Sequence, residues 1–319
     1  MEKKTELSVD TVKVEELPEL LICEMGRVIK GQNRLLKLLM TGILSDGHIL
    51  LEGLPGTGKT TIAQTLSALI DQADFRRIQF TPDLLPYDIT GVDVWNQESS
   101  SFEFRPGPVF THILLADEIN RTTPKVQSAL LEVMAEQQVS IGRETYHLKD
   151  FFLVLATQNP LDHEGTYPLP EAQKDRFLMK LIPEYPDAEA ELAILKGDPS
   201  HAVLPALKPV CSILDFLDCR IRASEVYCDD TLMKAAVRIV QQTRRHKRLT
   251  AGVSPRGALM LIRACRSYAF VEKRNYVTDQ DMIEIAPYVL AHRIIPVSPE
   301  TDCMELIEEL VRRELKILH

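Results

Sequence analysis

Candidate strands alternate with helix-like segments through the first half of this chain. After a mainly helical start over residues 1–47, apolar strand candidates occur at residues 49–51, 77–80, 112–116 and 152–156. Between these runs, apolar residues recur every three or four positions, as they do on the buried face of a helix. Strands that alternate with helices are typical of a parallel sheet covered by helices on both faces. The pattern therefore predicts an α/β domain.

The pattern changes at residues 181–186, where two prolines interrupt the sequence LIPEYP. Downstream, apolar residues keep helical spacing and no further strand-like run appears, so we predict only helices. Helix starts are indicated by an aspartate at 229 or 230, by Ser254 before a proline, and by Thr278 with an aspartate three residues on. We predict an α/β domain over residues 1–185 and an all-helical lid domain over residues 186–319.

Two predicted hairpins interrupt the α/β alternation. Residues 83–110 are rich in turn residues and contain strand candidates at 92–95 and 102–104. A second hairpin pairs residues 138–141 with residues 145–148. Loops and hairpins added to a rigid core usually serve binding rather than packing. We therefore expect both hairpins to contact partners or substrates.

Residues 53–60, with the sequence GLPGTGKT, match the phosphate-loop pattern G-x-x-x-x-G-K-[ST]. A candidate strand precedes them and a helical pattern follows. Glycines let backbone N–H groups surround phosphates, and the helix N-terminus adds partial positive charge. Lys59 is expected to reach the β- and γ-phosphates, and the Thr60 hydroxyl is expected to bind Mg²⁺. The predicted nucleotide-binding residues are Gly53, Gly56, Thr57, Gly58, Lys59, Thr60 and Thr61.

Two carboxylates, Asp117 and Glu118, follow the strand candidate at 112–116. Ligands of open parallel sheets bind at the carboxyl ends of the strands, so both side chains are expected near the phosphate loop. Asp117 is the candidate Mg²⁺ ligand, acting through water, and Glu118 is the candidate base that orients and deprotonates the attacking water. The alternative is an acidic loop after a buried strand, which the phosphate loop upstream disfavours.

Three further polar residues carry weaker signals. Asn159 either hydrogen-bonds the γ-phosphate or the attacking water, or is a turn asparagine before proline. Arg176 closes a short helix and is a candidate arginine finger for a neighbouring subunit. Arg256 lies in the first turn of a helix, where its charge opposes the helix dipole, so it is either a phosphate ligand or a solvated arginine. The basic cluster at 244–248 fits a helix C-terminus better than nucleic-acid binding.

Composition narrows the possible classes of protein. The chain has 319 residues, of which 45% are hydrophobic and 26% charged, as in a globular protein with sizeable cores. Its net charge of −9 argues against a surface that wraps nucleic acid. No apolar run is long enough to cross a bilayer, and no apolar stretch of a secretory signal follows the charged N-terminus. Because the six cysteines show no C-x-x-C pairing, we expect free thiols and a cytoplasmic protein.

The motifs together resemble the AAA+ ATPases, and within them the MoxR family. The resemblance covers nearly the whole chain. It rests on the phosphate loop and on residues 80–91, 104–110, 114–121, 156–160, 164–177 and 252–256. It implies a P-loop AAA+ core with a parallel sheet and a helical C-terminal lid domain.

The same resemblance implies roles for individual residues. Asn159 becomes sensor 1, Arg176 the arginine finger that acts in trans, and Arg256 sensor 2, which also binds the nucleotide. Val28 and Ile29 are expected beside the adenine of ATP. The two hairpins correspond to the helix-2 and pre-sensor-1 insertions of the family.

The resemblance also implies partners and an activity. We expect ATP hydrolysis with Mg²⁺ in a homo-oligomeric ring, a hexamer, that remodels or activates a protein client. The family pattern suggests a separate partner with a von Willebrand factor A domain. Two alternatives share the core: a nucleic-acid motor and a chelatase-type motor. The hairpins offer few basic residues, which disfavours nucleic acid, and the chelatase alternative differs mainly in its partner.

Overall fold

A five-stranded parallel sheet organises the N-terminal half of the chain. The computed structural model describes residues 13–54, 56–142, 144–159 and 167–316. The strand order is β10-β1-β9-β6-β3. The strands are β1 (Ile49–Glu52), β3 (Phe75–Gln79), β6 (Ile113–Asp117), β9 (Leu153–Gln158) and β10 (Met179–Leu181). Four were predicted; β10 was not, because its three residues are too few to show a pattern beside two prolines.

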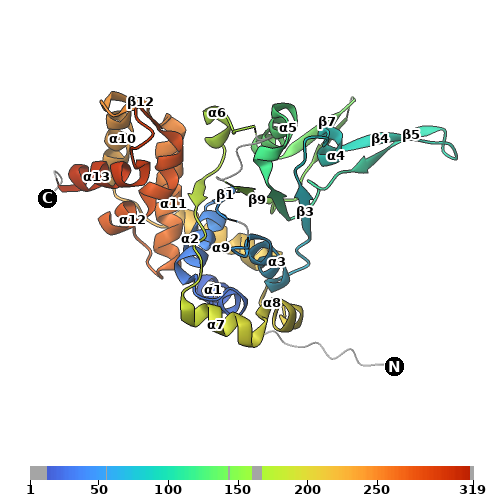
Figure 1. The fold of residues 1–319 in the computed structure, drawn as a ribbon, viewed down its shortest axis with the longest axis horizontal. Helices are drawn as coiled ribbons and strands as arrows, with labels where there is room; N and C mark the ends of the chain where they lie inside the picture. The colour runs from blue at the N-terminus through green and yellow to red at the C-terminus, as the bar shows by residue number, and fades with distance from the viewer. Residues whose placement is uncertain (1–12, 55, 143, 160–166, 317–319) are drawn as a thin grey trace.

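Helices cover both faces of this sheet. Successive side chains of a strand point to opposite faces, so Leu50 joins the core under α5 (Pro124–Glu136) while Ile49 and Leu51 join the core on the other face. That second face is covered by three helices, α1 (Leu17–Val28), α2 (Asn33–Leu44) and α3 (Lys59–Leu69). In Figure 1, α5 lies above the strands and α1 and α3 lie below them. The predicted α/β fold is confirmed.

Both predicted hairpins are present. The first pairs β4 (Gly91–Asn96) with β5 (Ser101–Pro106), and the second pairs β7 (Gln138–Ile141) with β8 (Glu144–His147). Phe104 stacks on Tyr146 with ring centroids 4.0 Å apart, which joins the two hairpins at their bases. The first hairpin projects from the body of the molecule (Figure 1). The remaining short elements of this half are β2 (Ile70–Asp71), α4 (Pro86–Thr90), the 3₁₀ helix η1 (Ile119–Arg121) and α6 (Glu171–Lys174).

The C-terminal part is mainly helical, as predicted. Its helices are α7 (Ala188–Gly197), α8 (Pro199–Ala202), η2 (Leu204–Ala206), α9 (Ile213–Glu225), α10 (Asp230–Arg245), α11 (Pro255–Val271), α12 (Asp279–Leu290), η3 (Ala291–Arg293) and α13 (Cys303–Lys316). The prediction that no strand follows residue 186 is wrong. Three short strands occur: β11 (Cys211–Ser212), β12 (Leu249–Ala251) and β13 (Ile295–Pro296). Each pairs with a distant segment, β11 with β2 and β12 with β13, so local periodicity could not reveal them.

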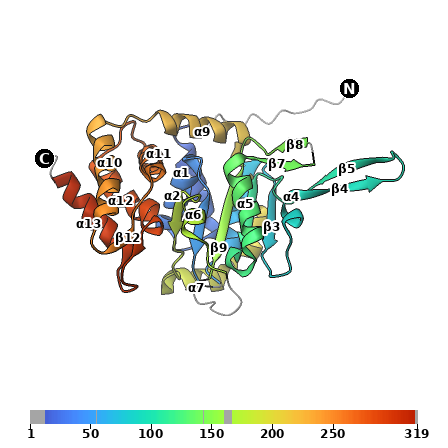
Figure 2. The same cartoon turned by 90° about the horizontal axis from the view of Figure 1, so that it is seen from above.

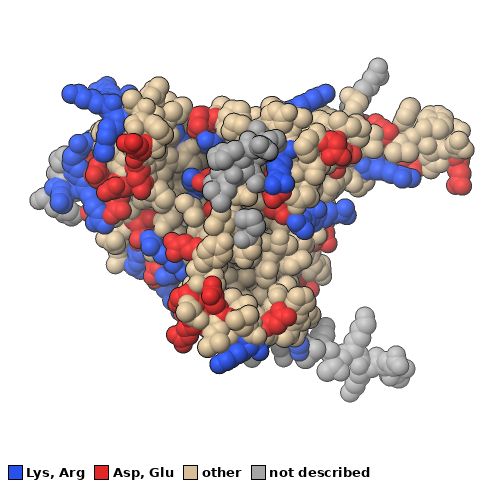
Figure 3. Space-filling model, viewed as in Figure 1, with Lys and Arg blue, Asp and Glu red and all other residues tan. Residues whose placement is uncertain are grey.

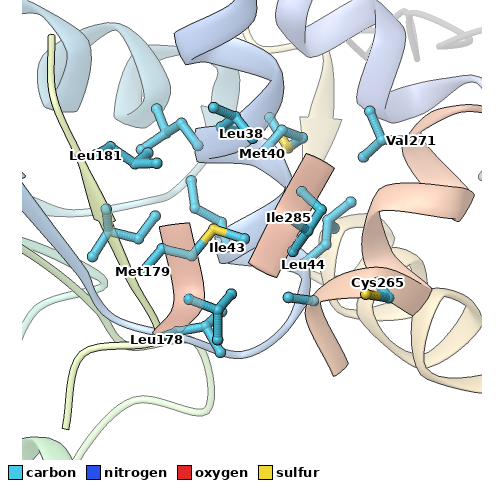
Figure 4. Packing of buried hydrophobic residues seen from close by; sticks show 14 of the residues in the cluster. Leu38, Met40, Ile43, Leu44, Leu178, Met179, Leu181, Cys265, Val271 and Ile285 are labelled. Atoms are coloured by element: carbon cyan, nitrogen blue, oxygen red, sulfur yellow. The ribbon is translucent and has the colours of Figure 1, made fainter. Parts of the chain in front are cut away.

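The helical part shares a core with the α/β part. Residues of α2 such as Ile43 and Leu44 lie between Met179 of β10 and the lid residues Cys265 and Ile285 (Figure 4). Figure 2 shows α11 and α12 beside α1 and α2. Helix α2 therefore packs on both halves of the chain. The division at residues 185 and 186 stays a prediction.

The helix starts follow the predicted signals with one exception. Asp229 caps α10 by accepting from the Thr231 N–H, and Thr278 with Asp281 forms a capping box at α12. Ser254 occupies the N-cap position of α11 but makes no capping hydrogen bond. Its hydroxyl instead donates to the Asp175 carboxylate at 3.3 Å, so tertiary contact replaces the cap.

Two other expectations concern the cysteines and membrane spans. All six cysteines are free. No helix among the described residues combines the length and apolar character needed to cross a bilayer.

Candidate functional site

The phosphate loop joins the buried strand β1 to the first turn of α3. Gly56 and Gly58 have φ angles of 84° and 81°, in the left-handed region that favours glycine. A Cβ atom added at either residue would meet nothing within 4 Å, so open space lies in front of this backbone. Helix α3 has no acidic residue in its first turn and no side-chain cap. Its first N–H groups are therefore available to an anion such as phosphate. Pro55 lies outside the described residues.

Lys59 lies between the loop and two carboxylates. Its Nζ donates to the carbonyl of Gly53 at 2.6 Å and to that of Leu54 at 3.1 Å. Burial lowers the pKa of Lys59, while the negative charges of Asp117 and Glu118 raise it. The predicted lysine and the predicted carboxylates are thus brought together at one edge of the sheet.

A cavity of about 210 Å³ opens beside the phosphate loop. Val28 and Ile29, the predicted adenine contacts, line it together with Gly56, Thr57, Gly58 and Thr61. Sequence reasoning missed the opposite wall. That wall is formed by Pro186, Ile194, Pro199 and Ser200, in and around α7 and α8.

Four larger cavities, of about 670, 610, 480 and 410 Å³, lie elsewhere on the described part of the chain. None of these four is lined by a phosphate-loop residue. The cavity of about 210 Å³ is therefore the better nucleotide candidate, because it alone of the five adjoins the anion-binding backbone.

Thr157 connects the two predicted carboxylate residues. Its buried hydroxyl donates to Asp117 Oδ1 at 2.6 Å and accepts from the Glu118 N–H at 2.8 Å. Glu118 itself adopts a left-handed backbone, with φ of 58°. For a residue other than glycine this conformation is uncommon and is held by its surroundings. Thr157 belongs to a predicted motif, but the sequence did not single it out.

Both carboxylates also accept hydrogen bonds from basic or amide side chains. Arg77 of β3 donates to Asp117 Oδ2 from Nε at 3.1 Å and from Nη2 at 2.7 Å. Gln79 donates to Glu118 Oε2 at 2.6 Å, and Arg121 lies 3.3 Å from the same oxygen. Sequence reasoning missed these three residues. Strand β3 pairs with β6 in register Gln79–Asp117, which brings Arg77 and Gln79 to the carboxylates, whereas Arg121 follows Glu118 by three residues.

The geometry at Asp117 fits a magnesium site. Mg²⁺ usually takes one or two carboxylates and completes its octahedron with phosphate oxygens and water. Asp117 at the end of β6 and Thr60 in the first turn of α3 supply one carboxylate and one hydroxyl. These donors fit the ion, with Arg77 as a competing partner of Asp117.

Asn159 follows the central strand between the loop and the carboxylates. Strand β9 lies between β1 and β6, and Glu52 is opposite Gln158. The Gly53 N–H donates to the Gln158 carbonyl, so Asn159 comes next to the start of the phosphate loop. Its side chain is buried. This placement agrees with the sensor prediction and does not test the role.

Arg176 lies at the opposite edge of the sheet. The Leu178 N–H donates to the carbonyl of His48, the residue before β1, so Arg176 precedes the amino ends of β10 and β1. The phosphate loop follows the carboxyl end of β1, a strand of four residues and thus about 13 Å long. Among the described residues, the Arg176 guanidinium has no hydrogen-bond or ion-pair partner. Arg176 and the phosphate loop of one subunit are therefore held apart.

Arg256 follows a residue that contacts the neighbour of Arg176, and it does not reach the phosphate loop. Ser254, two residues earlier, contacts Asp175. Asp175 also pairs with Arg293 Nε at 2.8 Å. Arg293 is buried, donates to the carbonyls of Phe177 and Val289, and has its pKa lowered to about 10 by burial. Arg256 does not line the cavity at the phosphate loop.

Comparison with known proteins covers most of the chain. Residues 48–179 match the family model described as "ATPase family associated with various cellular activities (AAA)", and residues 241–313 match the AAA lid domain. The chain is 45% identical over 291 residues to the uncharacterized protein YeaC of Bacillus subtilis, which covers 91% of this chain and 90% of YeaC. It is 45% identical over 283 residues to Chaperone MoxR1 of Mycobacterium tuberculosis, with 86% and 74% coverage.

A solved structure agrees with the fold. A crystal structure from Cytophaga hutchinsonii superposes with a TM-score of 0.87 at 41% sequence identity, covering 94% of each chain.

Proposed function

The chain belongs to the MoxR family of AAA+ ATPases, and we propose that it hydrolyses ATP at the interfaces of a homo-oligomeric ring. One observation carries the proposal. The phosphate loop and the carboxylates lie at the carboxyl edge of the sheet, whereas Arg176 and Arg256 lie at the amino edge. A complete site then needs the carboxyl edge of one subunit and the amino edge of the next.

The carboxyl edge would bind and activate the reactants. The phosphate loop and Lys59 bind the triphosphate of ATP, and Val28 and Ile29 contact its base. Mg²⁺, held by Thr60 and Asp117, would neutralise charge on the phosphates. Glu118 accepts the proton of the attacking water, and Asn159 orients that water. Thr157 keeps the two carboxylates in a common arrangement, because it hydrogen-bonds to both residues.

The amino edge would act on the neighbouring subunit. Arg176 stabilises the charge that develops on the γ-phosphate, as an arginine finger does. Arg256 lies in the first turn of α11, and Ser254 at the start of this helix contacts Asp175, the residue before Arg176. Both arginines would therefore reach the neighbouring subunit together. Arg256 thus acts as a sensor on the neighbour's nucleotide in this proposal.

A protein is the client that the surface supports best. One relative bears the name Chaperone MoxR1. The projecting first hairpin carries an exposed aromatic pair, Trp95 and Phe102, with ring centroids 5.2 Å apart. Such a pair suits an apolar polypeptide segment. Remodelling of a client, with a von Willebrand factor A domain protein as partner, remains part of this proposal.

Mixing two inactive variants tests the shared site. Lys59→Ala should abolish ATP binding, measured by calorimetry, and Arg176→Ala should bind ATP but hydrolyse it very slowly. In an equal mixture, roughly a quarter of the interfaces should pair an intact Lys59 with an intact Arg176. These interfaces should hydrolyse ATP.

The control replaces Arg245, an exposed arginine of α10, by alanine. Mixing Arg245→Ala with Lys59→Ala should give the activity expected from dilution of active subunits. No recovery in the Lys59 and Arg176 mixture, under conditions where both variants assemble, would overturn the shared site.

A further inference from the structure

Helix α7 exposes its apolar residues instead of burying them. Ala190 is the one residue of this helix that is buried, and it packs toward Gly31. On the opposite side, Ala188, Glu191, Leu192 and Leu195 follow the spacing of one helix face. Leu195 is 82% exposed and Leu192 is 48% exposed. An exposed apolar stripe on a short helix of this kind marks a contact surface.

Acidic side chains border the N-terminal part of this stripe, and Lys196 is the one basic residue of α7. Glu184, Asp187, Glu189 and Glu191 are all exposed. Neither the Glu189 nor the Glu191 carboxylate has a hydrogen-bond or ion-pair partner in the described part of the chain. Figure 3 shows acidic side chains over the region of α7 at the lower edge of the molecule.

Helix α11 carries a stripe of complementary charge. Arg256, Leu259 and Arg263 are exposed and follow one another at helical spacing. Leu259 is 53% exposed, and no guanidinium partner is present for Arg256 or Arg263 within residues 13–54, 56–142, 144–159 and 167–316. Two positive charges therefore flank a leucine on α11, whereas negative charges lie near two leucines on α7.

The two stripes cannot meet within one subunit. Helix α7 contributes Ile194 to the cavity at the phosphate loop, whereas α11 begins beside Asp175 at the opposite edge of the sheet. Helices α7 and α11 lie apart in both ribbon views (Figures 1 and 2). Two different complementary surfaces on one chain form head-to-tail contacts, which generate a ring when the rotation between successive copies closes.

We propose that the α7 stripe of one copy (Ala188, Glu191, Leu192, Leu195) docks on the α11 stripe of the next (Arg256, Leu259, Arg263). This inference rests on the proposed function and adds the surface that holds the ring together. Because Arg256 is part of the α11 stripe and α7 borders the nucleotide cavity, docking brings Arg256 to the neighbour's nucleotide. The occupant of the α7 stripe is thus a second copy of this chain.

A charge exchange between the stripes provides the first test. Glu191→Arg and Arg263→Glu each place like charges across the contact and should weaken ATP-dependent assembly by on the order of tenfold or more. The double variant should recover assembly, measured by sedimentation velocity. Glu225→Arg on α9 and Lys234→Glu on α10, both exposed and outside the two stripes, are the matched controls and should assemble like the wild type.

The leucines provide a second test that separates docking from misfolding. Leu195→Asp should abolish assembly, whereas Leu214→Asp, at a residue of α9 that is 77% exposed, should not. A mixture of Leu195→Cys and Leu259→Cys chains should form disulfide-linked pairs with ATP, and neither variant alone should do so.

The outcomes distinguish the two proposals. If the wild type assembles and the Lys59 and Arg176 variants complement each other, but none of the stripe variants changes assembly, the docking surface is wrong and the shared site stands. If Leu195→Asp retains assembly and loses only a client, the α7 stripe binds another protein and the proposal is overturned. If the wild type does not assemble with ATP, both proposals fail.

Discussion

At the carboxyl edge of the sheet, the functional side chains have partners within the subunit, and at the amino edge the two candidate arginines have none among the described residues. Asp117 contacts Arg77 and Thr157, and Lys59 contacts loop carbonyls. Arg176 and Arg256 are positioned through neighbouring residues, and within the described part of the chain their guanidinium groups make no hydrogen bond or ion pair. The carboxyl edge is therefore preorganised by the fold of one chain, and in our proposal the amino edge acts on the nucleotide of another copy.

Removing Arg176, the arginine that is proposed to act across the interface, should have the largest effect on hydrolysis. Arg176→Ala should lower kcat by roughly 10³–10⁵-fold, because an arginine finger stabilises charge only in the transition state. ATP affinity of the subunit should stay unchanged, since Arg176 is remote from the phosphate loop. Steady-state hydrolysis and calorimetry measure the two quantities. Full activity of Arg176→Ala would show that the amino edge is not catalytic.

Glu118→Gln tests the carboxyl edge by itself. Loss of a general base should slow hydrolysis by roughly 10²–10⁴-fold, while ATP binding and assembly persist. Glu136→Gln, an exposed glutamate at the end of α5, is the matched control. A turnover rate within about twofold of the wild type would assign the base to another residue, given the usual size of this effect.

The next prediction concerns the stability contributed by His48, a buried histidine at the amino edge of the sheet. The ring accepts from the Val154 N–H through Nδ1, and Nε2 lies 3.2 Å from the Met134 carbonyl, so the neutral form satisfies both nitrogens. Burial lowers the pKa of His48 from 6.5 to about 4. The unfolded chain then binds more protons between these pH values. This contribution to stability is complete above pH 6.5 and is lost as the pH falls to about 4.

The expected size of the His48 contribution is about 3 kcal/mol. It is measured as the difference in unfolding free energy between the wild type and His48→Asn across this pH range. Taking the difference removes the contribution of the buried His292, whose pKa is also lowered by burial. His201→Asn, at an exposed histidine, should keep the wild-type pH dependence. A parallel pH dependence of the wild type and His48→Asn would contradict the assignment.

The smallest expected effect concerns the competition for Asp117. Arg77→Gln removes a half-exposed ion pair of the kind worth up to about 1 kcal/mol, so the Mg²⁺ requirement for ATP binding should fall by at most about fivefold. Arg76→Gln, the exposed neighbour on β3, should leave it unchanged. A higher Mg²⁺ requirement in Arg77→Gln would indicate that Arg77 positions Asp117 instead of competing for it.

Local patterns predicted much of this molecule. The phosphate loop could be read directly, because its glycines, its lysine and the helix that follows are contiguous, and their backbone conformations depend on neighbouring residues. The placement of Asp117 and Asn159 near the loop followed from the general rule for parallel sheets. Both hairpins and the capping boxes are also local. Residue roles and the protein client stay predictions.

Other features depended on contacts between distant segments. The pairing of β3 with β6 delivers Arg77 and Gln79 to the carboxylates, and no short pattern encodes that register. The short strands β10 to β13 exist only because of their partners.

By itself, the sequence determined that this chain has a phosphate loop with paired carboxylates, because those features are written in contiguous residues. Only the tertiary structure decided that Arg176 and Arg256 share the edge opposite the loop, and that α7 walls the nucleotide cavity. Which edge a side chain reaches depends on the direction and pairing of β10 and on the contact of Ser254 with Asp175. Those contacts join residues far apart in the chain, and only folding brings them together.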